Sequence, residues 1–104
     1  MPTTLLCPAA DVPLNGCRRI SRGRHGAIAL FNLDGRFYAT DDRCSHGNAS
    51  LAQGDIDEGV VYCPLHAGGF DIATGEPVHP PCDEPIRTYR LHEQDGDLYL
   101  AADE

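Results

Sequence analysis

The sequence contains no lysine and no tryptophan. All eight basic residues are arginines, and sixteen acidic residues bring the net charge to −8. A nucleic-acid-binding domain presents a basic face, and here only the short arginine patch at 18–24 could supply one. We therefore expect no nucleic-acid partner. The acidic balance favours a protein that is steered toward basic patches on protein partners, or one that is simply kept in solution by its charge.

Long apolar runs are also missing. No stretch of about 18 apolar residues occurs, which argues against a transmembrane helix. The N-terminus lacks the basic segment and the apolar core of a signal peptide. We expect no membrane partner and a cytoplasmic location. The five cysteines are an odd number, and in this setting they argue against a disulfide framework.

The periodic signals are those of short β-strands joined by tight turns. The length of 104 residues suits one domain, and 11 glycines and 8 prolines disfavour a helix bundle. Dipeptides typical of two-residue hairpin turns separate apolar segments at three places. These predicted hairpins join 27–33 to 36–40 through Asp34-Gly35, 56–57 to 60–62 through Glu58-Gly59, and 86–91 to 98–101 through 94–97. Shorter strands are predicted at 5–7 and 17–20, with one helical turn at 9–13. The pattern predicts a small antiparallel β domain.

The segment from 41 to 82 is rich in glycine and proline and carries the chemistry. It contains Cys44-Ser45-His46 and, after sixteen intervening residues, Cys63-Pro64-Leu65-His66. Both pairs follow predicted strands, so two loop tips could share one metal centre. Structural zinc sites usually combine pairs of like residues, whereas each pair here is Cys followed by His. This arrangement suits a diiron cluster with two Cys on one iron and two His on the other.

Two segments, 44–51 and 63–75, resemble the Rieske signature. They are most similar to the Rieske-type ferredoxins of bacterial aromatic-ring-hydroxylating dioxygenase systems, and the likeness covers nearly the whole chain. It implies an all-β Rieske fold, a small antiparallel β-sandwich or barrel with a loop-rich insert. Residues 1–104 would form a single domain, with a cluster-binding subdomain at roughly 41–82. One Rieske-type 2Fe-2S cluster is implied, with Cys44 and Cys63 on the inner iron and His46 and His66 on the outer one.

The resemblance also implies an electron carrier rather than a catalyst. One electron would enter from a ferredoxin reductase that uses FAD and NADH. It would leave to a terminal Rieske non-haem iron oxygenase, and a monomer is expected. Three alternatives stay open: a small subunit of assimilatory nitrite reductase, a structural zinc module, and a ligand-sensing regulator of the same fold.

The surroundings of the ligands predict a low reduction potential. Quinol-oxidising Rieske proteins place hydroxyl donors and a disulfide near the cluster, where this sequence has Leu65, Gly68 and Phe70. Fewer donors to sulfur stabilise the reduced state less, so we expect roughly −150 mV rather than +300 mV. Gly47 and Pro64 would let backbone N–H groups approach the sulfurs.

The remaining candidates are interpreted as structural. Cys7, Cys17 and Cys82 have no paired His and are expected to pack as small apolar residues. His25, His79 and His92 are expected in surface or capping roles. Asp41 and Asp42 are interpreted as a solvated loop face, with added negative charge near the cluster as the alternative. From the resemblance, Pro77, Pro80 and Pro81 would form a rigid loop over the cluster.

Overall fold

The computed structural model describes residues 4–23, 26–44, 49–64, 68–80 and 84–101, and these form three antiparallel sheets. The sheet orders are β1-β11-β10, β2-β3-β4-β9 and β5-β6-β7-β8. The strands are β1 (Thr4–Pro8), β2 (Cys17–Ser21), β3 (Ala27–Leu33), β4 (Arg36–Asp41), β5 (Ile56–Asp57), β6 (Val60–Tyr62), β7 (Gly69–Asp71), β8 (Pro77–His79), β9 (Thr88–Tyr89), β10 (Leu91–Gln94) and β11 (Asp97–Leu100). Two 3-10 turns, η1 (Ala9–Asp11) and η3 (Leu51–Gln53), accompany them.

All three predicted hairpin turns are confirmed. The β3–β4, β5–β6 and β10–β11 strands are each joined by two residues with positive φ. The first residue of each turn is Asp34, Glu58 or Asp95, with φ between 50° and 54°, and a glycine follows it. This is the type I′ geometry, whose twist matches that of the flanking strands. The predicted helical turn is also present, as η1.

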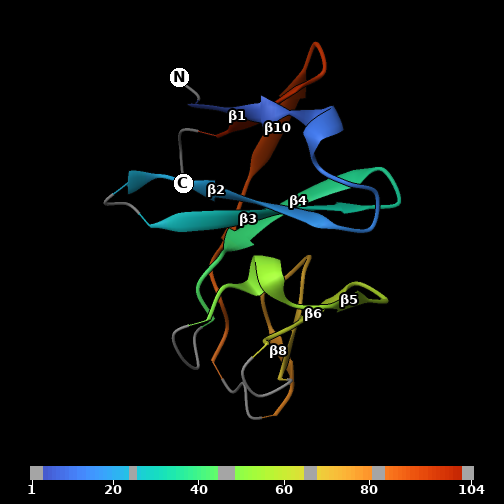
Figure 1. Cartoon of the computed structure of the whole chain (residues 1–104), viewed down its shortest axis with the longest axis vertical. Coiled ribbons are helices and arrows are strands. Elements are labelled where there is room, and N and C mark those ends of the chain that lie inside the picture. The colour runs from blue at the N-terminus through green and yellow to red at the C-terminus, as the bar shows by residue number, and fades with distance from the viewer. Residues whose placement is uncertain (1–3, 24–25, 45–48, 65–67, 81–83, 102–104) are drawn as a thin grey trace.

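Strand β3 lies at the centre of the molecule because both of its faces are buried. Ile28 and Leu30 pack into a core shared with β1 and β11, whereas Ala29 and Phe31 pack into a second core shared with the insert. Figure 1 shows the result as three tiers along the longest axis, with β2–β4 in the middle and β5–β8 at one end. The insert is therefore presented at the end of the molecule opposite to β1 and β10.

Two local predictions differ from the structure. The insert contains more regular structure than its glycines and prolines indicate, because β7 and β8 pair with each other there, and Pro77 lies in β8. The predicted continuous strand at 86–91 is divided at Arg90. Its first part, β9, pairs with β4, and its continuation, β10, pairs with β11. An alternating pattern looks the same in either sheet, so it does not reveal a strand that changes partners.

None of the helices within the described parts of the chain is long and apolar enough to cross a membrane.

Candidate metal centre

Cys44 and Cys63 occupy equivalent positions in two hairpin loops. Arg43 pairs with Ser50 in an isolated antiparallel bridge, and the next residue, Cys44, donates its backbone N–H to Ala49 O at 3.0 Å. In the second loop, Tyr62 pairs with Gly69, and Cys63 donates its backbone N–H to Gly68 O at 2.7 Å. In both cases the last hydrogen bond encloses four residues. Each cysteine therefore donates the backbone hydrogen bond that closes its loop, and the two loops enclose the same number of residues.

Both cysteines are buried in one apolar core. Cys44 is 1% exposed and Cys63 is 2% exposed, and they belong to the core that also contains Phe31 and Phe70. The other members of this core, here called the insert core, are Ala29, Leu51, Val61, Ile72 and Ile86. Cys44 is a free thiol, so the two sulfurs are not joined in a disulfide. Two buried thiols that lack this bond, on two equivalent loops, are a donor set that suits iron or zinc.

Only the two cysteines of the predicted quartet can be placed. His46 and His66 lie outside the described residues, as do Gly47, Leu65, Pro81 and Cys82. Gly68 and Phe70 are both buried, and neither side chain carries a hydrogen-bond donor. The part of the predicted environment that can be placed is therefore apolar, as the sequence indicates.

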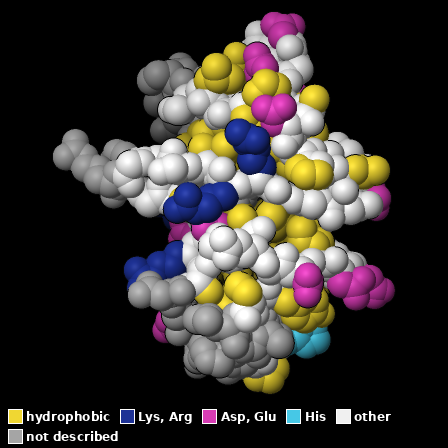
Figure 2. All heavy atoms as spheres, in the orientation of Figure 1, with side chains coloured by type: hydrophobic (Ala, Val, Ile, Leu, Met, Phe, Trp, Pro, Cys, Tyr) yellow, Lys and Arg dark blue, Asp and Glu magenta, His cyan; other side chains and the backbone are white. Residues whose placement is uncertain are grey.

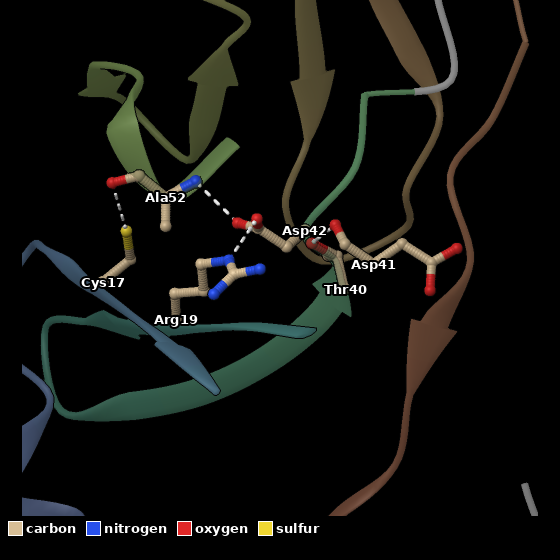
Figure 3. Close-up of polar contacts among 6 residues, drawn as sticks. All are labelled: Cys17, Arg19, Thr40, Asp41, Asp42 and Ala52. Carbon is tan, nitrogen blue, oxygen red and sulfur yellow. Dashed lines mark hydrogen bonds and ion pairs between the residues drawn. The ribbon is translucent and has the colours of Figure 1, made fainter. Parts of the chain in front are cut away.

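The first loop is anchored by a buried carboxylate, Asp42, which is only 4% exposed. Its Oδ1 accepts the backbone N–H of Ala52 in η3 at 2.9 Å, and its Oδ2 accepts the Nε–H of Arg19 in β2 at 3.1 Å. Figure 3 shows this carboxylate between Arg19 and Ala52. Because Asp42 precedes Cys44 by two residues, it fixes the start of the first loop against both the middle sheet and η3.

The carbonyl group of Ala52 is held as well. The Cys17 thiol donates to Ala52 O at 3.2 Å (Figure 3). Burial raises the pKa of the Cys17 thiol to about 11, and the neighbouring Asp42 carboxylate acts in the same direction. The thiol is therefore protonated and able to donate near neutral pH. Cys17 packs against the insert core, so the predicted packing role is confirmed and a hydrogen bond is added to it.

Asp41, the last residue of β4, is held to the neighbouring strand of the middle sheet. Its carboxylate accepts a hydrogen bond from the Tyr89 hydroxyl in β9, and its backbone N–H donates to Arg87 O at 2.9 Å. The guanidinium groups of Arg22 and Arg87 lie 5.5 and 4.8 Å from the centre of the Tyr89 ring. Burial and the Asp41 hydrogen bond raise the pKa of Tyr89. Asp42 thus ties the insert to the middle sheet where the chain enters it, and Asp41 holds the end of β4 to β9, the strand on which the chain returns.

The interpretation of Asp41 and Asp42 as a solvated loop face is therefore wrong. Asp42 is buried, and both carboxylates have defined partners. The sequence signal was the acidic pair itself, placed just before a ligand loop. The partners lie 10 to 48 positions away in sequence, so they could not be identified from it.

A close backbone contact joins the two loops. A Cβ atom added to Gly54 would lie 1.8 Å from Tyr62 O, the carbonyl directly before Cys63. Only glycine allows this approach, because any side chain would collide with backbone. The segment that follows the first ligand loop therefore packs directly on the strand that leads into the second.

The other predicted residues have structural surroundings. Cys7, in β1, is buried in the core that β1 shares with β3 and β11, as expected, and burial raises the pKa of its thiol. His79 is exposed and stacks on Tyr62, with ring centroids 5.5 Å apart, and His92 is exposed beside Gln94. His25 lies outside the described residues.

Comparison with known proteins gives concordant matches. The family model for the Rieske [2Fe-2S] domain matches residues 3–90. The 3-phenylpropionate/cinnamic acid dioxygenase ferredoxin subunit of Escherichia coli (strain K12) is 46% identical over 95 residues, covering 90% of this chain and 88% of the relative.

Solved structures agree. A Sphingomonas yanoikuyae B1 ferredoxin matches with a TM-score of 0.91 and 37% identity, over 95% of this chain and 97% of that one. A chain from the complex of reduced oxygenase and oxidized ferredoxin in carbazole 1,9a-dioxygenase also matches with a TM-score of 0.91. It is 35% identical, over 95% of this chain and 92% of that one.

Proposed function

We propose, from the premise that this chain belongs to the Rieske [2Fe-2S] domain family, that it carries single electrons to the terminal oxygenase of an aromatic-ring-hydroxylating dioxygenase system. The observation that carries the proposal is the pair of equivalent loops, each with a buried cysteine in the insert core. Ferredoxin subunits of dioxygenase systems are similar to it along most of their length. These relatives are electron-transfer components, and this chain is one as well, not an enzyme in itself.

Four residues would hold the cluster: Cys44 and Cys63 on one iron, and His46 and His66 on the other. When bound, the cluster supplies a one-electron couple whose potential the neutral imidazole ligands raise above that of an all-thiolate centre. The chain contributes the surroundings. Leu51, Val61 and Phe70 exclude water from the two thiols and offer their sulfurs no side-chain donor. An apolar wall opposes the extra negative charge of the reduced state, which supports a low potential.

The insert end of the molecule would be the docking surface. Pro64 and Val78 are exposed there. Among the described residues, Val78 is one of three large apolar side chains that are exposed to solvent. We include in the proposal a reductase that uses FAD and NADH as electron donor, a monomeric carrier and a cytoplasmic location. We also include a single domain spanning 1–104, with its cluster-binding subdomain at roughly 41–82.

The test begins with the visible spectrum and with low-temperature EPR of the dithionite-reduced protein. A brown protein whose reduced form gives the low average g value of mixed His/Cys ligation is expected. Cys63→Ser and His66→Ala should lose this signal, whereas Cys7→Ser, which changes a buried cysteine in the other core, should keep it. A colourless protein with stoichiometric zinc after anaerobic preparation would contradict the proposal.

Electron delivery is tested separately, by stopped-flow oxidation of the reduced protein. The oxygenase of the E. coli 3-phenylpropionate/cinnamic acid dioxygenase system is the acceptor, with its own ferredoxin subunit as the reference. Oxidation that depends on oxygenase concentration supports the partner class. A protein with an intact cluster that this oxygenase does not oxidise would contradict it.

A further inference from the structure

A basic cavity lies beside the first ligand loop, and the electron-transfer role does not account for it. It has a volume of about 380 Å³ and is lined by Arg19, Gly26, Ala27, Asp42, Arg43, Ala49 and Ser50. Arg43 precedes Cys44, and Ala49 and Ser50 follow the loop on its other side. The cavity therefore opens at the root of the loop that would carry two of the four ligands.

Two arginines, Arg19 and Arg43, line this cavity, and most of their guanidinium donors have no partner among the described residues. Arg19 donates through Nε to Asp42, which leaves its two terminal amino groups, and its side chain is 54% exposed. Arg43 is exposed and makes no ion pair with any residue that the structure describes. Among the described residues of the lining, Asp42 is the only carboxylate, and its two oxygens already accept from Arg19 and Ala52. The open donors therefore give the cavity a positive character.

Figure 2 shows the arginine side chains of this face toward its left and centre, while most of the visible acidic ones lie at the top and right. The cavity is thus a local exception on a chain of net charge −8.

We infer that this cavity receives a carboxylate side chain from the rim of a redox partner and so fixes the rotation of the docked pair. The inference rests on the proposed function, because electron transfer brings a partner to the insert end. Guanidinium groups match carboxylates in shape and charge. The acidic surface as a whole repels a polyanion such as a nucleic acid, which favours a single carboxylate set in the surface of a protein. The net negative charge of this chain attracts the basic surface of the partner, and the cavity then selects one orientation of the docked pair.

The first experiment needs no partner. A fluorescein-labelled peptide with one glutamate in an otherwise uncharged glycine–serine sequence is titrated by fluorescence anisotropy at about 0.1 M salt, where screening leaves chiefly local charges to act. The peptide should bind the unaltered protein and Arg36→Glu alike. Arg43→Glu should weaken binding at least about tenfold, which is the effect expected from the loss of one charge-assisted hydrogen bond. Arg36 is the matched control because it lies at the far hairpin and its reversal changes net charge equally.

Three results would overturn the site. These are no binding to the unaltered protein, equal weakening by both reversals, and tighter binding of a thymidine oligonucleotide of the same charge. Visible spectra of all variants show whether each retains its cluster. If the Arg43→Glu variant loses its cluster, Arg43→Gln is used in its place in both experiments, with the same expected order of affinities.

The second experiment tests docking, with the stopped-flow assay of electron delivery. Arg43→Glu should slow oxidation by the oxygenase at least about tenfold more than Arg36→Glu, and Arg43→Lys should restore most of the rate. Equal rates for the two reversals would overturn the docking role. Peptide binding without any electron delivery by the unaltered protein would instead contradict the proposed function and leave the carboxylate site in place.

Discussion

Removal of the Asp42 carboxylate is expected to destabilise the protein more than any other single change to an acidic side chain in the described parts of the chain. In Asp42→Ala, the backbone N–H of Ala52 loses its acceptor. A hydrogen bond to a charged acceptor is worth about 1.5–3 kcal/mol. The second contact, to the half-exposed Arg19, adds at most about 1 kcal/mol because solvent screens it. The free energy of unfolding should fall by about 2–4 kcal/mol.

Thermal unfolding measures this difference. For a domain of this size, each kcal/mol corresponds to about 4–8 °C, so Tm should fall by more than about 8 °C. Far-UV circular dichroism and visible absorbance are recorded together at one heating rate, because cluster loss makes the transition irreversible. Asp42→Asn should lose about half as much, since its carbonyl oxygen can still accept from Ala52.

The matched control is Asp57→Ala, which removes an exposed carboxylate from β5 with the same change in net charge. It should alter stability by less than about 0.5 kcal/mol. If Asp42→Ala unfolds at the same temperature as Asp57→Ala, the assignment of Asp42 as the anchor of the first loop is refuted.

Four further predictions can be measured on the same material. The free energy of unfolding should decline between pH 9 and 11, because the Cys17 thiol ionises from its ordinary pKa of 9.0 in the unfolded chain and near 11 in the folded protein. Chemical denaturation at a series of pH values measures this decline, which should be smaller in Cys17→Ala. Protein-film voltammetry of the unaltered protein should give a reduction potential of roughly −150 mV. Phe70→Tyr should raise this potential by about 40 mV if the new hydroxyl donates to a cluster sulfur, because one such hydrogen bond is worth about 1 kcal/mol. Gly54→Ala should prevent cluster assembly during expression, because its methyl group would collide with Tyr62 O, whereas Gly35→Ala, at an open turn, should cost only about 1 kcal/mol. Reduction of the oxygenase should slow as ionic strength rises from about 10 to 300 mM, and a rate without salt dependence would exclude steering by the acidic surface.

Features set by neighbouring residues could be predicted from the sequence. The three hairpins follow from dipeptides such as Asp34-Gly35, because a two-residue turn with positive φ admits few other residues. The two cysteines of the ligand motif were predicted in two loops, and the structure places each at the backbone hydrogen bond that closes its loop. In both cases the information lies within a few positions of the chain, where residue type and spacing restrict the backbone directly.

Features that depend on distant partners could not be predicted. Asp42 lies between Asp41 and an arginine, a context in which a carboxylate is normally solvated. It is buried because η3 and β2 bring an N–H donor and a guanidinium to its two oxygens. The division of the strand at Arg90 has the same origin, since the alternation of apolar residues continues while the pairing partner changes from β4 to β11.

These distant contacts explain how short ligand loops can be held in place by so small a domain. Each loop is closed by its own backbone hydrogen bond, but nothing local relates one loop to the other. That relation comes from Asp42 on η3 and from Gly54 against Tyr62 O. The first contact fixes the start of the first loop on η3, and the second packs the segment after η3 on the strand that leads into the second loop. The distance between the two cysteines is therefore set by the frame of the insert before a cluster binds, and variants at these contacts should impair cluster retention more than variants at the exposed ends of the strands.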